Sequence, residues 1–164
     1  MDPVTVSTTI SRPREQVFEY LADIANHPEF TDHYLVDWHL TREDPQGTGA
    51  GARFRVKAPL SRFSWAEVTF VEVQPPYRIV ERGRMGKYNR IRTLGVYEVL
   101  QGAGSTTKVQ YTFESVPTLP SDRLMELFRG RGWTRRKNAK AMRRLRSILE
   151  EGRGRGKRAS VAGG

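Results

Sequence analysis

The sequence predicts an α+β fold, in which a seven-stranded antiparallel sheet packs against a long C-terminal helix and two short helices follow the first strand. Three observations predict it. An alternating strand-like run opens the chain, and a helical pattern follows it at once. Six more strand-like runs are separated by short links rich in Gly, Pro and small polar residues, as in hairpins between antiparallel strands. A long amphipathic run then ends the patterned part of the chain.

The first strand and the two short helices are predicted from residues 4–30. Residues 4–10 (VTVSTTI) alternate inward and outward positions, which predicts a half-buried strand. The next segment, 11–24, predicts a helix, because a serine can cap it, a proline fits its first turn and apolar residues recur at helical spacing. Pro28 disfavours helical backbone at the preceding residue, so we expect a short second helix or turn over 25–30.

The remaining elements follow from turn signals and periodicity. The six later strands are expected at 34–41, 51–59, 62–73, 77–84, 88–100 and 106–115. The segment PTLPSD ends the sheet, and a helix is expected from Ser121 to Glu151, with Gly152 as its C-terminal cap. Residues 152–164 have no apolar face and are predicted to form a disordered basic tail. This division leaves 1–151 as the one folded domain.

Composition excludes several classes of protein. The 164 residues include no cysteine, so neither a disulfide framework nor thiolate chemistry is expected. The first residues lack the basic and apolar regions of a signal peptide. No apolar run approaches the roughly 18 residues of a membrane span. We therefore expect a cytoplasmic protein without disulfide partners.

The net charge of +10 comes from the C-terminal part of the chain. Residues 1–128 carry 15 basic and 16 acidic side chains, whereas residues 129–164 carry 13 basic and 2 acidic ones. On the C-terminal helix, one side is apolar and most arginines lie off it. This apolar stripe consists of Leu124, Leu127, Phe128, Met142, Leu145 and Leu149. The basic residues are thus predicted to be the solvated back of a core-facing helix; the alternative is weak, non-specific contact of helix and tail with nucleic acid or an anionic membrane.

Hairpin pairing predicts which side chains of the middle strands share the inner face of the sheet. If PLSR closes the hairpin between the expected strands 51–59 and 62–73, Phe54 opposes Glu67, and Val56 opposes Trp65. Glu67 would then be an acid on an apolar face. Desolvation favours the protonated form of such an acid, which suits general acid–base chemistry. The alternatives are that the register of this hairpin differs, or that Arg131 or Arg135 of the C-terminal helix neutralises the acid.

The last hairpin gives a second set of inner residues. The link QGAGS can pair Tyr97 with Val109 and Gly95 with Tyr111, where the glycine would leave space for the ring. Glu98 and Lys108 would then form an ion pair on the outer face. One face of the sheet is therefore predicted to be apolar and aromatic.

Three segments resemble the START-like, or SRPBCC, superfamily, most closely its polyketide cyclase/dehydrase and lipid-transport branch. They are ISRPREQVFEYLADIANHPEF, EVTFVEVQPPYRIVERG and GAGSTTKVQYTFE, and the resemblance covers residues 3–151. It implies a helix-grip fold, in which a curved seven-stranded sheet wraps the C-terminal helix and leaves an apolar cavity. Members bind lipids, polyketides, quinones or hormones, and some catalyse cyclisation or dehydration. No catalytic motif of the family maps onto this chain.

The candidate ligand-binding residues are aromatic side chains of the inner face and residues near the middle of the helix. They are Trp38, Phe54, Trp65, Tyr97, Tyr111, Phe128, Arg131 and Asn138. The aromatic rings could stack on a flat ligand. On the helix, Gly130 and Gly132 weaken the middle, where polar residues interrupt the apolar stripe. That pattern indicates either a kink or a polar lip on a cavity.

Other combinations of polar residues are weaker candidates. Asp37 and His39 share a strand face and could form an acid–base pair, but Trp38 is the better core residue, so we expect the pair to face solvent. His27, His33 and His39 are six residues apart, and no cysteine or close set of carboxylates completes a site with them, so no metal site and no cofactor are expected. The glycine-bearing GRMGKYN and GAGS lie between strands, where turns rather than phosphate loops are found.

The leading hypothesis is a protein that binds a hydrophobic small molecule, of lipid-, polyketide- or quinone-like character, in a cavity between sheet and helix. The first alternative is an enzyme of the polyketide cyclase/dehydratase type that uses Glu67 as acid or base. The second is a basic surface module that contacts nucleic acid or an anionic membrane.

Overall fold

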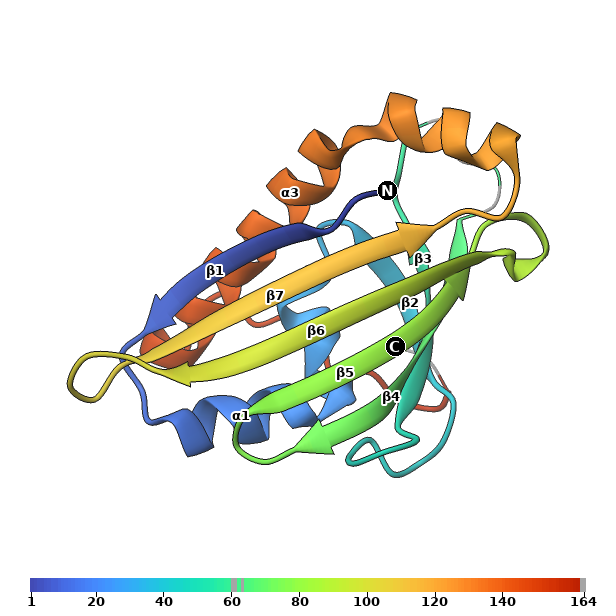
Figure 1. Cartoon of the computed structure of the whole chain (residues 1–164). Coiled ribbons are helices and arrows are strands. Elements are labelled where there is room, and N and C mark those ends of the chain that lie inside the picture. The colour runs from blue at the N-terminus through green and yellow to red at the C-terminus, as the bar shows by residue number, and fades with distance from the viewer. Residues whose placement is uncertain (60–61, 63, 163–164) are drawn as a thin grey trace.

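The computed structural model describes residues 1–59, 62 and 64–162, and it leaves the side chains of Met125, Phe128 and Arg129 undescribed. Seven strands form one antiparallel sheet in the order β1-β7-β6-β5-β4-β3-β2 (Figure 1). The strands are β1 (Val4–Ile10), β2 (Leu35–Leu40), β3 (Gly51–Val56), β4 (Trp65–Gln74), β5 (Arg78–Met85), β6 (Ile91–Gln101) and β7 (Thr107–Val116). The helices are α1 (Arg14–Ala22), η1 (Ile24–Asn26), α2 (His27–Thr31), η2 (Lys87–Asn89) and α3 (Pro120–Glu151). The predicted fold class is confirmed; residue 63, within the predicted strand 62–73, lies outside the described residues.

The core lies between the inner face of the sheet and the helices. Val17, Phe18 and Leu21 of α1 are buried, as the helical stripe predicted. Pro28 stands in the first turn of α2, where its missing N–H leaves no helical hydrogen bond unmade. The segment that the sequence left open between helix and turn is thus a short helix. It begins at His27, whose φ of −59° and ψ of −38° are helical, so the expectation of non-helical backbone at the residue before Pro28 was wrong.

Helix α3 consists of two parts that meet at Gly130. This residue has φ 61° and ψ 146°, which breaks the helical backbone, and Figure 1 shows the change of direction. After the kink, Met142, Leu145 and Ile148 are buried against the sheet. Before it, Leu124 and Leu127 are 56% and 77% exposed.

The predicted apolar stripe was therefore wrong for the first part of the helix. A continuous 3.6-residue period relates side chains only along an unbroken helix. The kink changes the phase between the two parts, so Leu124 and Leu127 do not continue the buried side of the second part.

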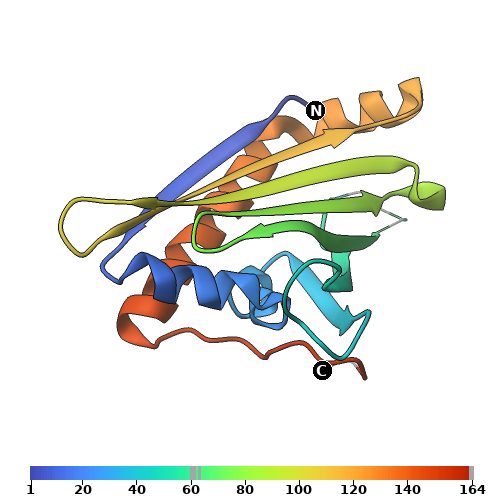
Figure 2. The ribbon, with the colours of Figure 1, turned by 60° about the horizontal axis from the view of Figure 1, so that its bottom comes forward.

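The C-terminal segment differs from the predicted disordered tail. Through Ala162 it lies alongside η1, α2 and the β2 edge (Figure 2). The backbone N–H of Ala159 donates to the carbonyl of Ala25 at 2.9 Å, and Leu40 N donates to Ser160 O at 2.9 Å. Arg155 pairs with Glu29 at 3.0 Å and Arg158 with Asp23 at 3.0 Å. Composition alone missed these contacts because the acids lie more than a hundred residues earlier in the chain.

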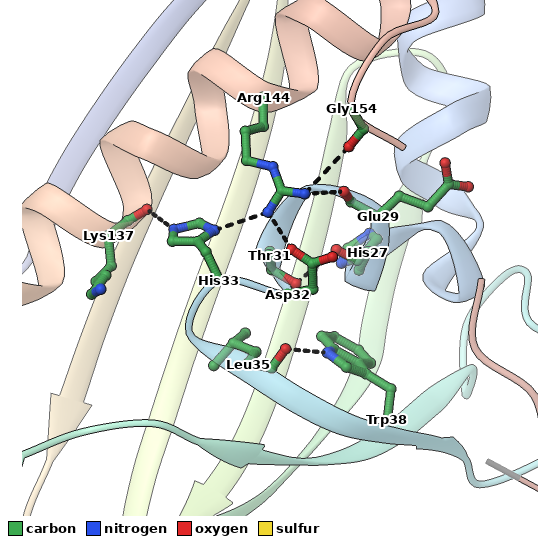
Figure 3. A network of polar contacts seen from close by, with 10 residues as sticks. All are labelled: His27, Glu29, Thr31, Asp32, His33, Leu35, Trp38, Lys137, Arg144 and Gly154. Atoms are coloured by element: carbon green, nitrogen blue, oxygen red, sulfur yellow. Dashed lines mark hydrogen bonds and ion pairs between the residues drawn. The ribbon is translucent and has the colours of Figure 1, made fainter. Parts of the chain in front are cut away.

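Arg144 joins α3, α2 and the C-terminal segment (Figure 3). Its guanidinium contacts the carboxyl of Asp32, donates to the carbonyl of Glu29 at 3.1 Å and donates to the carbonyl of Gly154 at 3.3 Å. It also lies 3.3 Å from Nδ1 of His33, whose Nε2 lies 3.1 Å from the carbonyl of Lys137. A planar guanidinium with five donors suits such a junction, because one side chain satisfies acceptors from three segments.

Candidate functional site

A cavity of about 460 Å³ lies between the inner face of the sheet and α3. Strands β2 to β7, together with α2 and both parts of α3, supply its walls. Its aromatic lining residues are Tyr34, Trp38, Phe54, Tyr97, Tyr111, Phe113 and Trp133. The volume falls within the range of about 300–1,000 Å³ that is usual for small-molecule sites.

The structure brings five of the predicted ligand-binding residues together in this wall. They are Trp38, Phe54, Tyr97, Tyr111 and Asn138. The rings of Trp38 and Phe54 lie 4.5 Å apart, and those of Tyr97 and Tyr111 stack at 4.3 Å. Asn138 enters from the second part of α3 and is buried. These contacts place one aromatic pair from β2 and β3 and another from β6 and β7 around the same cavity.

Three predicted ligand-binding residues are not part of this arrangement. Trp65 is 43% exposed on the outer face, with its ring 6.2 Å from that of His39. Arg131 is exposed and lies 3.7 Å from Asp2. The side chain of Phe128 lies outside the described part of the structure. Neither Arg131 nor Arg135 lines the cavity, so the alternative in which one of these arginines neutralises a cavity acid is not observed.

The expected position of Glu67 on the inner face is wrong. Arg53, and not Phe54, opposes Glu67. Ala66 and Val68 on either side are buried, so the alternation of β4 directs the Glu67 side chain outward even though the residue borders the cavity. The predicted hairpin register was off by one residue, and such a slip moves every side chain of a strand to the other face. The same slip explains the outward position of Trp65.

In the last hairpin the predicted face was right and the predicted partners were wrong. Tyr97 opposes Tyr111, and Glu98 opposes Gln110 instead of Lys108. Because the shift is two residues, the inner residues stay inside. Gly95 does not make room for a tyrosine ring. An added Cβ there would lie 2.3 Å from Oε1 of Glu81, so the glycine accommodates this carboxyl on the neighbouring strand.

Among the described residues, four acids line the cavity, namely Glu67, Glu81, Asp122 and Glu126, and of these Glu81 is the buried one. It is buried in β5, and Tyr111 Oη donates to its Oε1 at 2.8 Å. Burial raises the pKa of Glu81 to about 7, and the hydrogen bond from Tyr111 opposes this increase. No cation among the described residues pairs with this carboxyl within 4.0 Å. The carboxyl is therefore largely protonated below neutral pH.

The sequence carried a signal for Glu81. In the run RIVERGRM, Arg82 and Arg84 alternate with Glu81 and Met85. Two arginines on one face of a strand are best placed outside, which turns Glu81 inward. The inward position predicted for Glu67 depended on which residues close the β3–β4 hairpin, whereas the alternation in β5 does not depend on a turn.

A second polar pair faces the cavity from α2 and α3. Tyr34 follows α2, and its Oη donates to Oδ1 of Asn138 at 2.9 Å. Burial raises the pKa of Tyr34 above its ordinary value, and the nearby Glu81 carboxyl adds to the increase. The same two causes raise the pKa values of Tyr97 and Tyr111. All three tyrosines therefore keep their hydroxyl protons at neutral pH.

His27 is a buried core residue and Asp37 forms a surface ion pair, so neither belongs to an acid–base pair or a metal site. His27 is fully buried among aromatic rings, and burial lowers its pKa to about 4, so it is neutral at physiological pH. Its Nε2 lies 2.8 Å from the carbonyl of Leu21. Asp37 forms a solvent-exposed ion pair with Arg55 at 2.6 Å. Across the described residues, no three His, Cys, Asp or Glu side chains form a group that could hold a metal ion.

A comparison with protein-family models identifies the family. The model described as polyketide cyclase/dehydrase and lipid transport matches residues 1–150. This chain belongs to that family. The predicted resemblance is thereby confirmed. The family includes lipid transport as well as cyclase/dehydrase members, so membership is consistent with hydrophobic ligands.

Solved structures show the same fold at low sequence identity. Truncated norcoclaurine synthase from Thalictrum flavum has a TM-score of 0.69 and 11% identity, over 92% of this chain and 94% of that one. TTHA0849 from Thermus thermophilus has a TM-score of 0.65 and 15% identity, over 90% and 96%. DR_A0006 from Deinococcus radiodurans has a TM-score of 0.62 and 18% identity, over 92% and 98%. Curated protein sequences gave no significant match.

Among the described residues, no helix combines the length and apolar character needed to cross a membrane.

Proposed function

We propose that this protein binds a hydrophobic small molecule, of lipid-, polyketide- or quinone-like character, in the cavity between the sheet and α3. The observation that carries the proposal is the cavity itself, about 460 Å³ with walls built mainly from aromatic and aliphatic side chains. The tilted pair Trp38–Phe54 and the stacked pair Tyr97–Tyr111 offer aromatic surfaces in two parts of the wall, which suits a planar or extended ligand. Membership of a family that includes lipid transport supports the same conclusion.

The proposal is tested by filling the cavity. Ala66 lines the cavity from β4, whereas Thr69 of the same strand is exposed on the outer face. Ala66→Trp should weaken the binding of 1-aminoanthracene, a neutral apolar fluorescent probe, by at least about tenfold. Thr69→Trp is the matched control and should leave binding unchanged. Val68→Phe fills the same space with a smaller change, should Ala66→Trp fold poorly.

Two results would count against ligand binding in the cavity. One is a wild-type protein that gives no fluorescence enhancement with the probe. The other is equal binding by the Ala66→Trp and Thr69→Trp variants, with both folded by circular dichroism. Native mass spectrometry of protein purified from its own host adds an independent test, because a co-purified apolar molecule would show the ligand directly.

The buried carboxyl favours a second candidate function, a cyclase/dehydratase-type enzyme in which Glu81 takes the role that the sequence suggested for Glu67. Its buried position in the cavity wall, with a pKa of about 7, suits proton transfer to or from a bound carbonyl compound. The test is exchange of the α-protons of 2-tetralone in D₂O, followed by ¹H NMR. Glu81→Gln should slow exchange by about 100-fold or more, and Glu67→Gln should not. Exchange by the wild type no faster than in buffer would exclude this activity for the probe.

A further inference from the structure

The cavity holds two polar groups on opposite walls that lack partners. Asn138 is 3% exposed, and its Nδ2 makes no hydrogen bond although it is buried. Its Oδ1 is occupied by the hydroxyl of Tyr34, which fixes the amide with the N–H₂ group free. Leaving a buried donor unsatisfied costs about 1–3 kcal/mol. An acceptor supplied by a ligand would remove that cost.

Glu81 presents the second group. Its Oε1 accepts from Tyr111, and among the described residues its Oε2 has no hydrogen bond. Both Glu81 and Asn138 line the cavity. The absence of a Cβ at Gly95 leaves the space in which the carboxyl sits, so its place is built into two neighbouring strands.

We propose that Asn138 and Glu81 form a polar subsite that binds the carbonyl oxygen of an otherwise apolar ligand, such as a ketone, an enone or a quinone. The inference rests on the proposed function, since it requires a ligand in the cavity. An N–H₂ group and a protonated carboxyl both donate hydrogen bonds, and a carbonyl oxygen has two lone pairs to accept them. A hydrocarbon of the same shape would leave both donors unpaired.

The subsite makes carbonyl binding depend on pH. Below neutral pH the Glu81 carboxyl carries its proton and donates, and above it the carboxylate repels a carbonyl oxygen. The titratable groups facing it are Tyr34 after α2, Tyr97 on β6 and Tyr111 on β7, with His27 of α2 beside Tyr97. The tyrosines titrate far above neutral pH, and His27 titrates near pH 4. Glu81 is thus the member of this group whose charge changes between about pH 6 and 8.5.

The experiment compares two probes of similar shape, menadione and 2-methylnaphthalene, by equilibrium dialysis. Menadione carries two ring carbonyls and 2-methylnaphthalene carries none; the chain contains no cysteine for menadione to modify. The double variant Tyr34→Phe/Asn138→Leu removes the amide donor together with the hydroxyl that it would leave unpaired. We expect it to raise the Kd for menadione roughly tenfold and to change the Kd for 2-methylnaphthalene by less than about twofold. Thr69→Leu, on the outer face of β4, is the control and should change neither Kd.

The pH arm uses Glu81→Gln, whose amide can still donate but does not titrate. The wild-type Kd for menadione should rise roughly tenfold from about pH 6 to pH 8.5, and that of Glu81→Gln should stay constant. If both probes bind the wild type but the variants weaken them equally, the carbonyl subsite is refuted while ligand binding stands. A pH-independent wild-type Kd for menadione would likewise refute the role of Glu81. If neither probe binds the wild type, the proposed function fails and the subsite with it.

Discussion

Replacing Glu81 by Gln should make the protein more stable at alkaline pH, and the size of the effect follows from the environment of the carboxyl. Burial raises the pKa of Glu81 from 4.5 to about 7. At about 1.4 kcal/mol per unit, this difference corresponds to about 3 kcal/mol. Between these two values the folded state holds a proton that the unfolded state has released. The free energy of unfolding therefore falls as the pH rises from about 4.5 to 7 and then levels off.

The glutamine variant isolates this contribution from that of His27. Burial lowers the pKa of His27 from 6.5 to about 4, so the folded state binds fewer protons there and stability rises with pH over that range. The two slopes oppose each other in the wild type. Because His27 is present in both proteins, subtraction leaves the Glu81 term: the stability of the wild type relative to Glu81→Gln should fall by about 3 kcal/mol between about pH 4.5 and 8.

Urea unfolding followed by tryptophan fluorescence and circular dichroism, at about five pH values across this range, measures the difference. Glu67→Gln is the matched control. It makes the same chemical change on the outer face of the adjacent strand, where the carboxyl is not buried. Parallel stability curves for the wild type and Glu81→Gln would refute the reasoning, because they would mean that the Glu81 carboxyl is hydrated in the folded protein. A fall of the same size in the Glu67→Gln comparison would refute the register described here.

Three further substitutions test other parts of the structure. Gly95→Ala places a Cβ 2.3 Å from the Glu81 carboxyl and should lower stability by about 1–3 kcal/mol while shifting the pH dependence, as urea titrations at several pH values would show. The Cβ added by Gly132→Ala meets no atom within 4 Å. This variant should stabilise the helix by up to about 1 kcal/mol, which a slightly higher melting temperature would show. Arg144→Leu removes the junction between α2, α3 and the C-terminal segment and should cost about 2–4 kcal/mol in urea unfolding; Arg143→Leu, one position away on an exposed side of α3, should cost much less.

The elements of the fold could be predicted because each depends on a short stretch of sequence. Alternation marks the strands, and the long helix follows from its apolar period after the proline-rich link. The pairing of β3 with β4 could not be predicted with the same security. It depends on how the link around residues 57–64 closes, and a change of one residue there reverses the faces of Glu67 and Trp65. The error in the β6–β7 pairing was harmless because an even shift preserves the faces.

Contacts between distant segments account for the other differences. The C-terminal segment is polar and basic, but Arg155 and Arg158 find acids on α2 and before η1. Composition gives no indication of which charges will meet across such a separation. The kink at Gly130 is a related case: two glycines near the middle of α3 predicted a weak point, but only packing decides where the chain bends and which leucines leave the core.

The placement of Glu81 is hard to explain as a requirement of the fold alone. At neutral pH and above, its buried carboxyl lowers stability by about 3 kcal/mol, a large share of the 5–15 kcal/mol typical of a domain. Ion pairing does not compensate, because the causes that set the pKa of this carboxyl are burial and the hydrogen bond from Tyr111, and no cation of the described chain is among them. A glycine at position 95, which weakens a strand, makes the space that the carboxyl occupies. An apolar residue at 81 would avoid both penalties. The arrangement therefore supports the proposed role of the carboxyl, together with the free amide of Asn138, in binding a carbonyl ligand.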